Sequence, residues 1–224
     1  GRIDGARVQV SVDGTPQGGG TLSVNGSVDV SRSALPGSFD IALAGLRYQD
    51  ADAFETEVDR GSLRLSGELA RNSQLSGQLI LGQTDIFLGG VAFGSAEPIP
   101  EITHTGETTA QRATRRKAGL LKSKGSGVGP RIGLDLDIQS PSRIFIRGRG
   151  LDAELGGGIR IGGTSQDVVA SGQFDLIRGR FILQGQRFDL SEASIFLRGS
   201  FDPYVRLVSS TTVEDTVISV VLEG

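Results

Sequence analysis

The chain has 224 residues, a net charge of −3 and a pI near 5.3, so no overall positive field indicates nucleic acid as a partner. Cysteine is absent and histidine occurs once, which excludes disulfides, thiolate metal sites and thiol nucleophiles. No apolar run of about 18 residues is present, so no segment is expected to cross a membrane as a helix. The absence of methionine and an end in mid-strand predict a segment of a longer chain.

The first part of the chain predicts several short strands, each with one apolar and one polar face. Apolar and polar residues alternate with period two, which is typical of half-buried strands. The expected strands cover residues 7–12, 22–30, 39–43, 63–69, 75–81 and 86–93. Residues 46–60 are more polar and predict only a weak strand with a loop.

A glycine recurs in the middle of these strands. Four five-residue units have the order apolar, polar, glycine, polar, apolar, and their glycines are Gly26, Gly67, Gly77 and Gly172. Each glycine therefore lies on the apolar face of its strand. Glycine inside a strand often marks a bend or a close approach of another backbone. We expect a sheet that bends at the same place in successive strands, although glycine that merely suits short strands is an alternative explanation.

Residues 94–131 break the alternation. Six basic residues occur between positions 112 and 124: Arg112, Arg115, Arg116, Lys117, Lys122 and Lys124. A long stretch without periodicity predicts a functional loop or a disordered insert, and we favour disorder. The basic residues could contact anionic lipid headgroups at about 1 kcal/mol each. A solvated loop is the simpler interpretation.

The strands resume after this insert. We expect them at residues 134–138, 144–146 and 155–161, and the clearest alternation covers residues 170–207. Turns are predicted at 185–186, 190–192 and 202–203. One side of the first strand in this stretch carries Ala170, Gly172, Phe174 and Leu176. One side of the next carries Ile177, Gly179, Phe181 and Leu183.

Residues with catalytic chemistry are scarce. The single histidine, His104, lies in the insert, so a Ser-His-Asp triad would depend on a loop residue. Asp135 and Asp137 alternate with leucines, so a wet strand face explains them more simply than a Ca²⁺ site or an acid–base pair. We expect no enzyme activity, no cofactor and no metal site.

No amphipathic helix of useful length is available to cover the apolar face of the sheet. That face must meet another sheet, its own sheet folded over, or a ligand. A folded sheet that stays partly open forms a trough suited to acyl chains, whose burial contributes roughly 0.8 kcal/mol per CH₂. A closed sandwich is the alternative. The candidate lining residues are Phe174, Leu176, Phe181, Leu183, Phe188, Leu190, Ile195, Leu197, Val205 and Leu207.

Segments of the second half resemble the C-terminal region of the TamB family. Residues 142–155 are similar to its strand and following glycine-containing turn, and residues 172–181 look like its block of alternating hydrophobic residues that ends on an aromatic one. Residues 188–190, and then 195–203 with Gly199, Asp202 and Pro203, resemble the strand and turn that come next. The resemblance covers residues 132–222 and is similar in style over 60–93.

This resemblance implies a β-taco, which is a long U-shaped sheet with an apolar groove. It implies a periplasmic protein of Gram-negative bacteria, anchored in the inner membrane by a segment outside this chain. It also implies phospholipid transport between the two membranes, a link to outer-membrane protein assembly, and an outer-membrane barrel of the Omp85 class, TamA, as partner.

We therefore predict an all-β fold in which residues 1–93 and 132–224 form two parts of one groove, separated by the insert at 94–131. Some 14–16 strands would give a groove of roughly 70 Å. The predicted function is a hydrophobic conduit that shields acyl chains. One alternative is a chaperone-like scaffold that binds unfolded outer-membrane or autotransporter strands at a sheet edge. A closed structural domain that binds no lipid is the other alternative.

Overall fold

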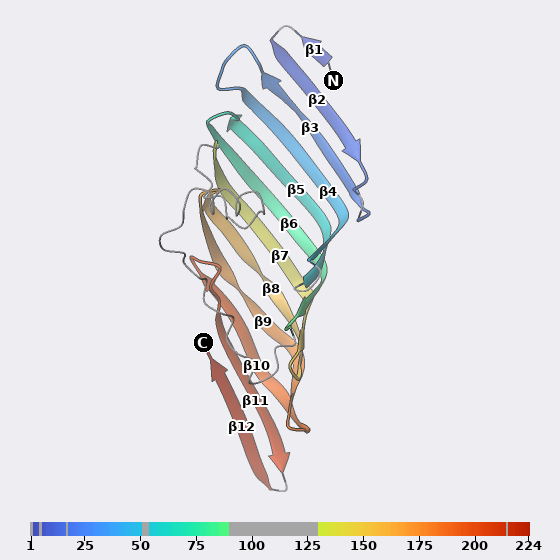
Figure 1. The fold of residues 1–224 in the computed structure, drawn as a ribbon, viewed down its shortest axis with the longest axis vertical. Helices are drawn as coiled ribbons and strands as arrows, with labels where there is room; N and C mark the ends of the chain where they lie inside the picture. The colour runs from blue at the N-terminus through green and yellow to red at the C-terminus, as the bar shows by residue number, and fades with distance from the viewer. Residues whose placement is uncertain (1, 5, 17, 51–53, 90–129, 214) are drawn as a thin grey trace, which may run out of the picture. The chain divides into compact units, whose positions relative to one another are not determined.

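The described residues of the computed structural model form one β-sheet. These residues are 2–4, 6–16, 18–50, 54–89, 130–213 and 215–224, and no helix occurs among them. The sheet has twelve strands, which lie in it in the same order as in the sequence (Figure 1). The strands are β1 (Arg2–Asp4), β2 (Arg7–Gly14), β3 (Thr21–Asp29), β4 (Pro36–Asp50), β5 (Phe54–Glu68), β6 (Asn72–Phe87), β7 (Arg131–Gly148), β8 (Leu151–Thr164), β9 (Asp167–Leu183), β10 (Gln186–Arg198), β11 (Tyr204–Val213) and β12 (Thr216–Glu223). The predicted all-β fold is confirmed.

Almost every pair of neighbouring strands is antiparallel, and the exception is the pair on either side of the insert. β6 and β7 are parallel, with Leu75 opposite Leu134 and Ile86 opposite Ile146. The residues before and after the insert therefore contribute to one continuous sheet. Residues 90–129 lie outside the described residues, so the predicted disorder of the insert stays a prediction, and so does the predicted strand beyond residue 89.

The strands are longer and fewer than the 14–16 expected. The strands expected at 75–81 and 86–93 belong, as far as the structure describes them, to β6, and those expected at 134–138 and 144–146 belong to β7. The turn predicted at 190–192 is also wrong, because β10 continues through it. In each case the register shifts at an irregularity inside the strand, which absorbs the extra residues without ending the pairing.

The polar segment 46–60 is also more regular than its sequence predicts. Its described residues, 46–50 and 54–60, form the end of β4 and the start of β5, where Arg47 lies opposite Glu57 and Tyr48 opposite Thr56. Cross-strand pairing compensates for the weak alternation there. Twelve strands at about 4.8 Å each span about 50 Å, which is shorter than the predicted groove.

Cross-strand register collects the apolar residues on one face of the sheet. Ile41, Leu63, Gly77, Leu136, Ile161 and Ala170 are successive partners from β4 to β9. We call the face that carries this row the inner face. The opposite face, which carries Arg64 and Asp135 among others, is the outer face.

Glycines on the inner face have a backbone that other residues rarely adopt. Among the recurring glycines, Gly67, Gly77 and Gly172 have φ values of +112°, +139° and +149°. A Cβ on Gly77 would overlap the carbonyl oxygen of Ser62 on the neighbouring strand. These glycines allow close approach of neighbouring strands on the inner face, as expected for a sheet that bends there.

We predict that Gly77→Ala lowers the free energy of unfolding by about 1–3 kcal/mol, because the new Cβ forces both backbone strain and a clash with Ser62. Gly14→Ala is the matched control, since nothing lies within 4 Å of a Cβ at the end of β2. Urea unfolding of both variants measures the difference. Equal stability of the two variants would contradict the role assigned to the inner-face glycines.

Candidate functional site

The ten lining residues predicted from the sequence all lie on the inner face. They belong to β9, β10 and β11, and register links them directly: Phe181 lies opposite Phe188, Phe174 opposite Ile195, and Ile195 opposite Val205. Whether they contact a ligand is a separate question, which depends on how much of each side chain is accessible.

Ile177 does not share the face predicted for it. Leu176 lies opposite Leu155, whereas Arg178 lies opposite Glu154, so Ile177 has no partner on β8. This bulge restores Gly179 to the same face as Leu176 and leaves Ile177 on the outer side, where its side chain is 48% exposed. The prediction that Ile177 lies beside Gly179 and Phe181 was wrong because period-two counting does not register a bulge.

The inner face of β7 to β11 is largely packed against itself. Buried side chains of four strands form one cluster, which consists of Ile144, Ile146, Ala153, Leu155, Leu190, Ala193 and Leu207. Leu155 at its centre is only 2% exposed. Three predicted lining residues, Phe188, Leu190 and Leu207, are buried to a similar degree. Leu183 and Val205 are each 37% exposed and are the most accessible of the ten.

The inner face of β3 to β6 is more accessible. Among the described residues, every buried hydrophobic side chain lies at Ile144 or later in the chain. The apolar inner-face residues of β3 to β6 are half-buried: Val24, Ile41, Leu43, Leu63, Leu65 and Leu79. The sequence prediction placed the lining in residues 174–207 and omitted these positions. The same alternation marked them as one apolar face, and only burial distinguishes an accessible row from a packed one.

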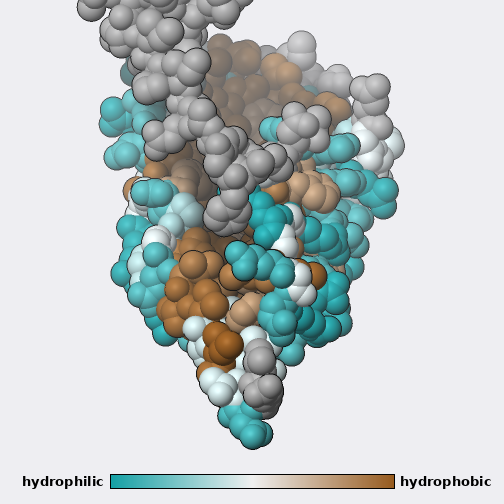
Figure 2. Space-filling view, turned by 60° about the horizontal axis from the view of Figure 1, so that its bottom comes forward, coloured by the Kyte–Doolittle hydropathy of each residue, from teal (hydrophilic) through white to brown (hydrophobic). Residues whose placement is uncertain are grey.

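Apolar side chains gather in a hollow with polar side chains on both sides of it, as Figure 2 shows. Several hydroxyl groups of the inner face are hydrogen-bonded within the chain. Thr56 and Thr84 share a hydrogen bond of 2.7 Å, and Ser140 donates to the carbonyl oxygen of Ser142 at 3.2 Å. The buried Ser209 hydroxyl has no hydrogen-bond partner among the described residues. The hollow therefore offers hydrocarbon contact and little directional hydrogen bonding.

The outer face carries cross-strand pairs of arginine and carboxylate. Arg64 Nε donates to Asp40 at 2.7 Å, and Arg160 donates to Asp135 at 2.7 Å. The pKa of Arg64 is raised, mainly by its hydrogen bond to Asp40 and to a smaller extent by the attraction between the two charges. These side chains are mostly exposed, so each pair contributes little to stability. The main effect of these charged pairs is to keep the outer face of the sheet hydrated.

The described residues contain no group of three or more His, Cys, Asp and Glu side chains that could hold a metal ion. His104 lies outside the described residues. No helix in the part of the chain that the structure describes is long and apolar enough to cross a membrane.

A single open sheet that curls around an apolar inner face and keeps a polar outer face defines an all-β groove protein of the β-taco type. A sequence model of the TamB C-terminal domain matches residues 10–221, and the chain therefore belongs to the TamB family. This family is a translocation and assembly module. The matched range includes the N-terminal strands, beyond the residues 132–222 whose resemblance to the family was clearest. No curated protein matches the chain.

We predict that Leu155→Ala lowers the free energy of unfolding by about 2–5 kcal/mol, because it leaves a cavity in the packed cluster. Leu183→Ala, at an accessible end of β9, should change it by about 0.5 kcal/mol. Urea unfolding of the two variants tests the distinction. Similar losses would mean that both positions are equally packed.

Proposed function

We propose that the inner face shields phospholipid acyl chains and that the chain is part of a hydrophobic conduit between the inner and outer membranes. The observation that supports this most directly is the half-buried aliphatic face of β3 to β6 on a single-layered sheet. Apolar surface left in water is unfavourable by about 25 cal/mol per Å². When a protein leaves a continuous apolar surface accessible to water, that surface usually marks an interaction site.

An acyl chain fits the chemistry of this face better than a polar ligand does. It needs no hydrogen bonds, and the hydroxyls of Thr56, Thr84 and Ser140 already have partners within the chain. Each methylene group moved from water into the groove contributes about 0.8 kcal/mol, whatever its orientation. The proposed mechanism is therefore passive guidance of lipid along the inner face, without a chemical step.

Membership of the TamB family supports the setting of this proposal. The conduit would lie in the periplasm and would be linked to outer-membrane protein assembly. The parent protein would be anchored in the inner membrane by a segment outside this chain. Other parts of the parent would meet an outer-membrane barrel of the Omp85 class, as TamA does.

The test is photocrosslinking in cells, with the probe on neighbouring residues that lie on opposite faces. Leu63 and Arg64 form such a pair in the accessible part of the sheet, and Leu183 and Ile182 form one at the end of β9. The proposal expects lipid adducts at Leu63 and Leu183. Protein-only adducts at Leu63, or equal lipid adducts on both faces, would contradict it.

We predict that Leu183→Asp reduces lipid capture by about tenfold or more, because a carboxylate on the inner face loses its hydration when an acyl chain lies against it. Ile182→Asp is the control, since its side chain lies on the outer face and is 47% exposed. Lipid extracted with each purified variant is quantified by mass spectrometry. Equal damage from both changes would reject the assignment of faces.

One observation favours the chaperone-like alternative. β12 pairs only with β11 among the described strands, and its Val217 and Val221 are 66% and 53% exposed. Such an edge can accept another strand by backbone pairing. A probe at Val217 that captures outer-membrane β-strands in cells, together with no lipid adduct at Leu63, would favour this function over the conduit.

A further inference from the structure

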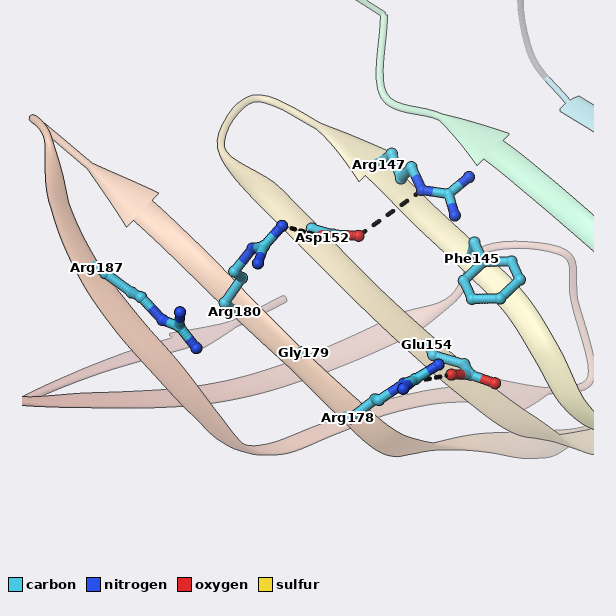
Figure 3. A pocket seen from close by; sticks show the side chains of 8 residues that line it. All are labelled: Phe145, Arg147, Asp152, Glu154, Arg178, Gly179, Arg180 and Arg187. Carbon is cyan, nitrogen blue, oxygen red and sulfur yellow. Dashed lines mark hydrogen bonds and ion pairs between the residues drawn. The ribbon is translucent and has the colours of Figure 1, made fainter.

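The strongest concentration of arginine on the outer face surrounds a cavity over β7 to β10. The cavity has a volume of about 420 Å³ and is lined by Phe145, Arg147, Asp152, Glu154, Arg178, Gly179, Arg180 and Arg187. Four guanidinium groups thus meet two carboxylates, and Figure 3 shows the labelled side chains on the same side of the sheet. Elsewhere on the outer face, pairs such as Arg64 with Asp40 match one arginine with one carboxylate.

Both carboxylates of this cavity already interact with arginine side chains, and one of them is largely buried. Asp152 accepts from Arg180 at 2.8 Å and lies 3.7 Å from Nε of Arg147. Glu154 accepts from Nε of Arg178 at 2.6 Å and from the backbone N–H of Arg143 at 3.3 Å, and its side chain is only 11% exposed. Neither carboxylate is therefore able to occupy all the donors that face it.

Two further carboxylates bind the same arginines from outside the cavity lining. Asp85 pairs with Arg147, and Asp189 pairs with Arg187 at 2.9 Å. With these partners the charges of the whole cluster balance. The cavity therefore attracts an anion through the guanidinium N–H groups that have no carboxylate partner, rather than through a large net positive charge.

Arg178 and Arg180 each keep several of those remaining donors. A guanidinium group carries five N–H donors. Within the described residues, Arg178 uses only Nε and Arg180 uses only one terminal nitrogen. By contrast, Arg160 directs both Nε and a terminal nitrogen to Asp135. Arg178 is also 77% exposed, so its terminal nitrogens are accessible from water.

We propose that this cavity is a binding site for a phosphate group. Several guanidinium groups that line one cavity suit a tetrahedral group with three acceptor oxygens, because arginine binds phosphate through parallel N–H···O hydrogen bonds. The cavity is larger than a phosphate ion and has room for the group that the phosphate is attached to. A phosphorylated lipid headgroup and a free phosphate compound share this chemistry.

The position of the cavity allows either source. Arg187 lies opposite Ile182 at the hairpin that joins β9 to β10, and Leu183 at the same hairpin lies on the inner face. A headgroup that extends past the end of β9 could reach the cavity from the groove, and a soluble phosphate could reach it from water. Because the site is on the outer face, it does not depend on acyl chains in the groove.

The test is calorimetric titration of the chain with inorganic phosphate and with glycerol 3-phosphate. Arg178→Gln and Arg180→Gln should each weaken binding about tenfold, and Arg180→Lys, which keeps the charge but loses the fork, should fall between Gln and wild type. Arg64→Gln is the matched control and should bind as wild type does. Thermal unfolding of every variant checks that the fold is retained.

The source of the phosphate is then distinguished with vesicles. Flotation compares pure phosphatidylcholine with an equal mixture of phosphatidylcholine and phosphatidic acid. Retention on the mixture that is lost in Arg180→Gln indicates a lipid headgroup, and binding of the soluble phosphates alone indicates a free compound. Absence of phosphate binding, unchanged affinity in both Gln variants, or tighter binding of a polyglutamate peptide than of phosphate would overturn the proposal.

Discussion

Close approach of strands at glycine, on one face of a single sheet, is the constraint on which the rest of the structure depends. Gly77 lies between Leu63 and Leu136, and Gly172 lies between Ile159 and Leu197. In each case a large side chain has a neighbour without a Cβ, so the apolar row can crowd together while the polar row on the other face spreads. A sheet built in this way curls toward its apolar face, and it needs no second layer to bury part of that face. The groove is thus a consequence of where glycine occurs in each strand.

The two halves of the inner face differ in how deeply their apolar side chains are buried. From β7 to β11 the aliphatic side chains and small residues such as Ala153 and Ala193 pack into a nearly dry cluster. From β3 to β6 the leucines remain half-buried. The first region stabilises the curl, and the second leaves hydrocarbon surface for a ligand. This division fits the proposed lipid conduit, since the apolar surface is held open by backbone geometry at glycine.

Much of the fold could be predicted from the sequence, because alternation identifies both the strands and their faces. All ten lining candidates from Phe174 to Leu207 lie on one face as a result.

Three features could not be predicted. Bulges such as the one at Ile177 reverse the alternation without a signal in composition. The parallel pairing of β6 with β7 depends on a connection that carries no periodicity. The difference between the packed Leu190 and the accessible Leu63 depends on the curl of the whole sheet, which no local pattern encodes. The arginine cavity escaped prediction for a related reason, because it forms only when strands β7 to β10 bring residues far apart in sequence together.

The central claim is that lipid lies along the inner face and not the outer one. Paramagnetic broadening by a phospholipid with a nitroxide in its acyl chain, observed on methyl-labelled protein, tests this most directly. Leu43 on the inner face lies between Ala42 and Ala44 in β4, and both alanines are exposed on the outer face. The account predicts strong broadening of the Leu43 methyl signals, and of those of Leu63 and Leu79, with the signals of the two alanines little changed. Equal broadening of the leucines and the alanines, or none at all, would contradict a lipid-lined groove.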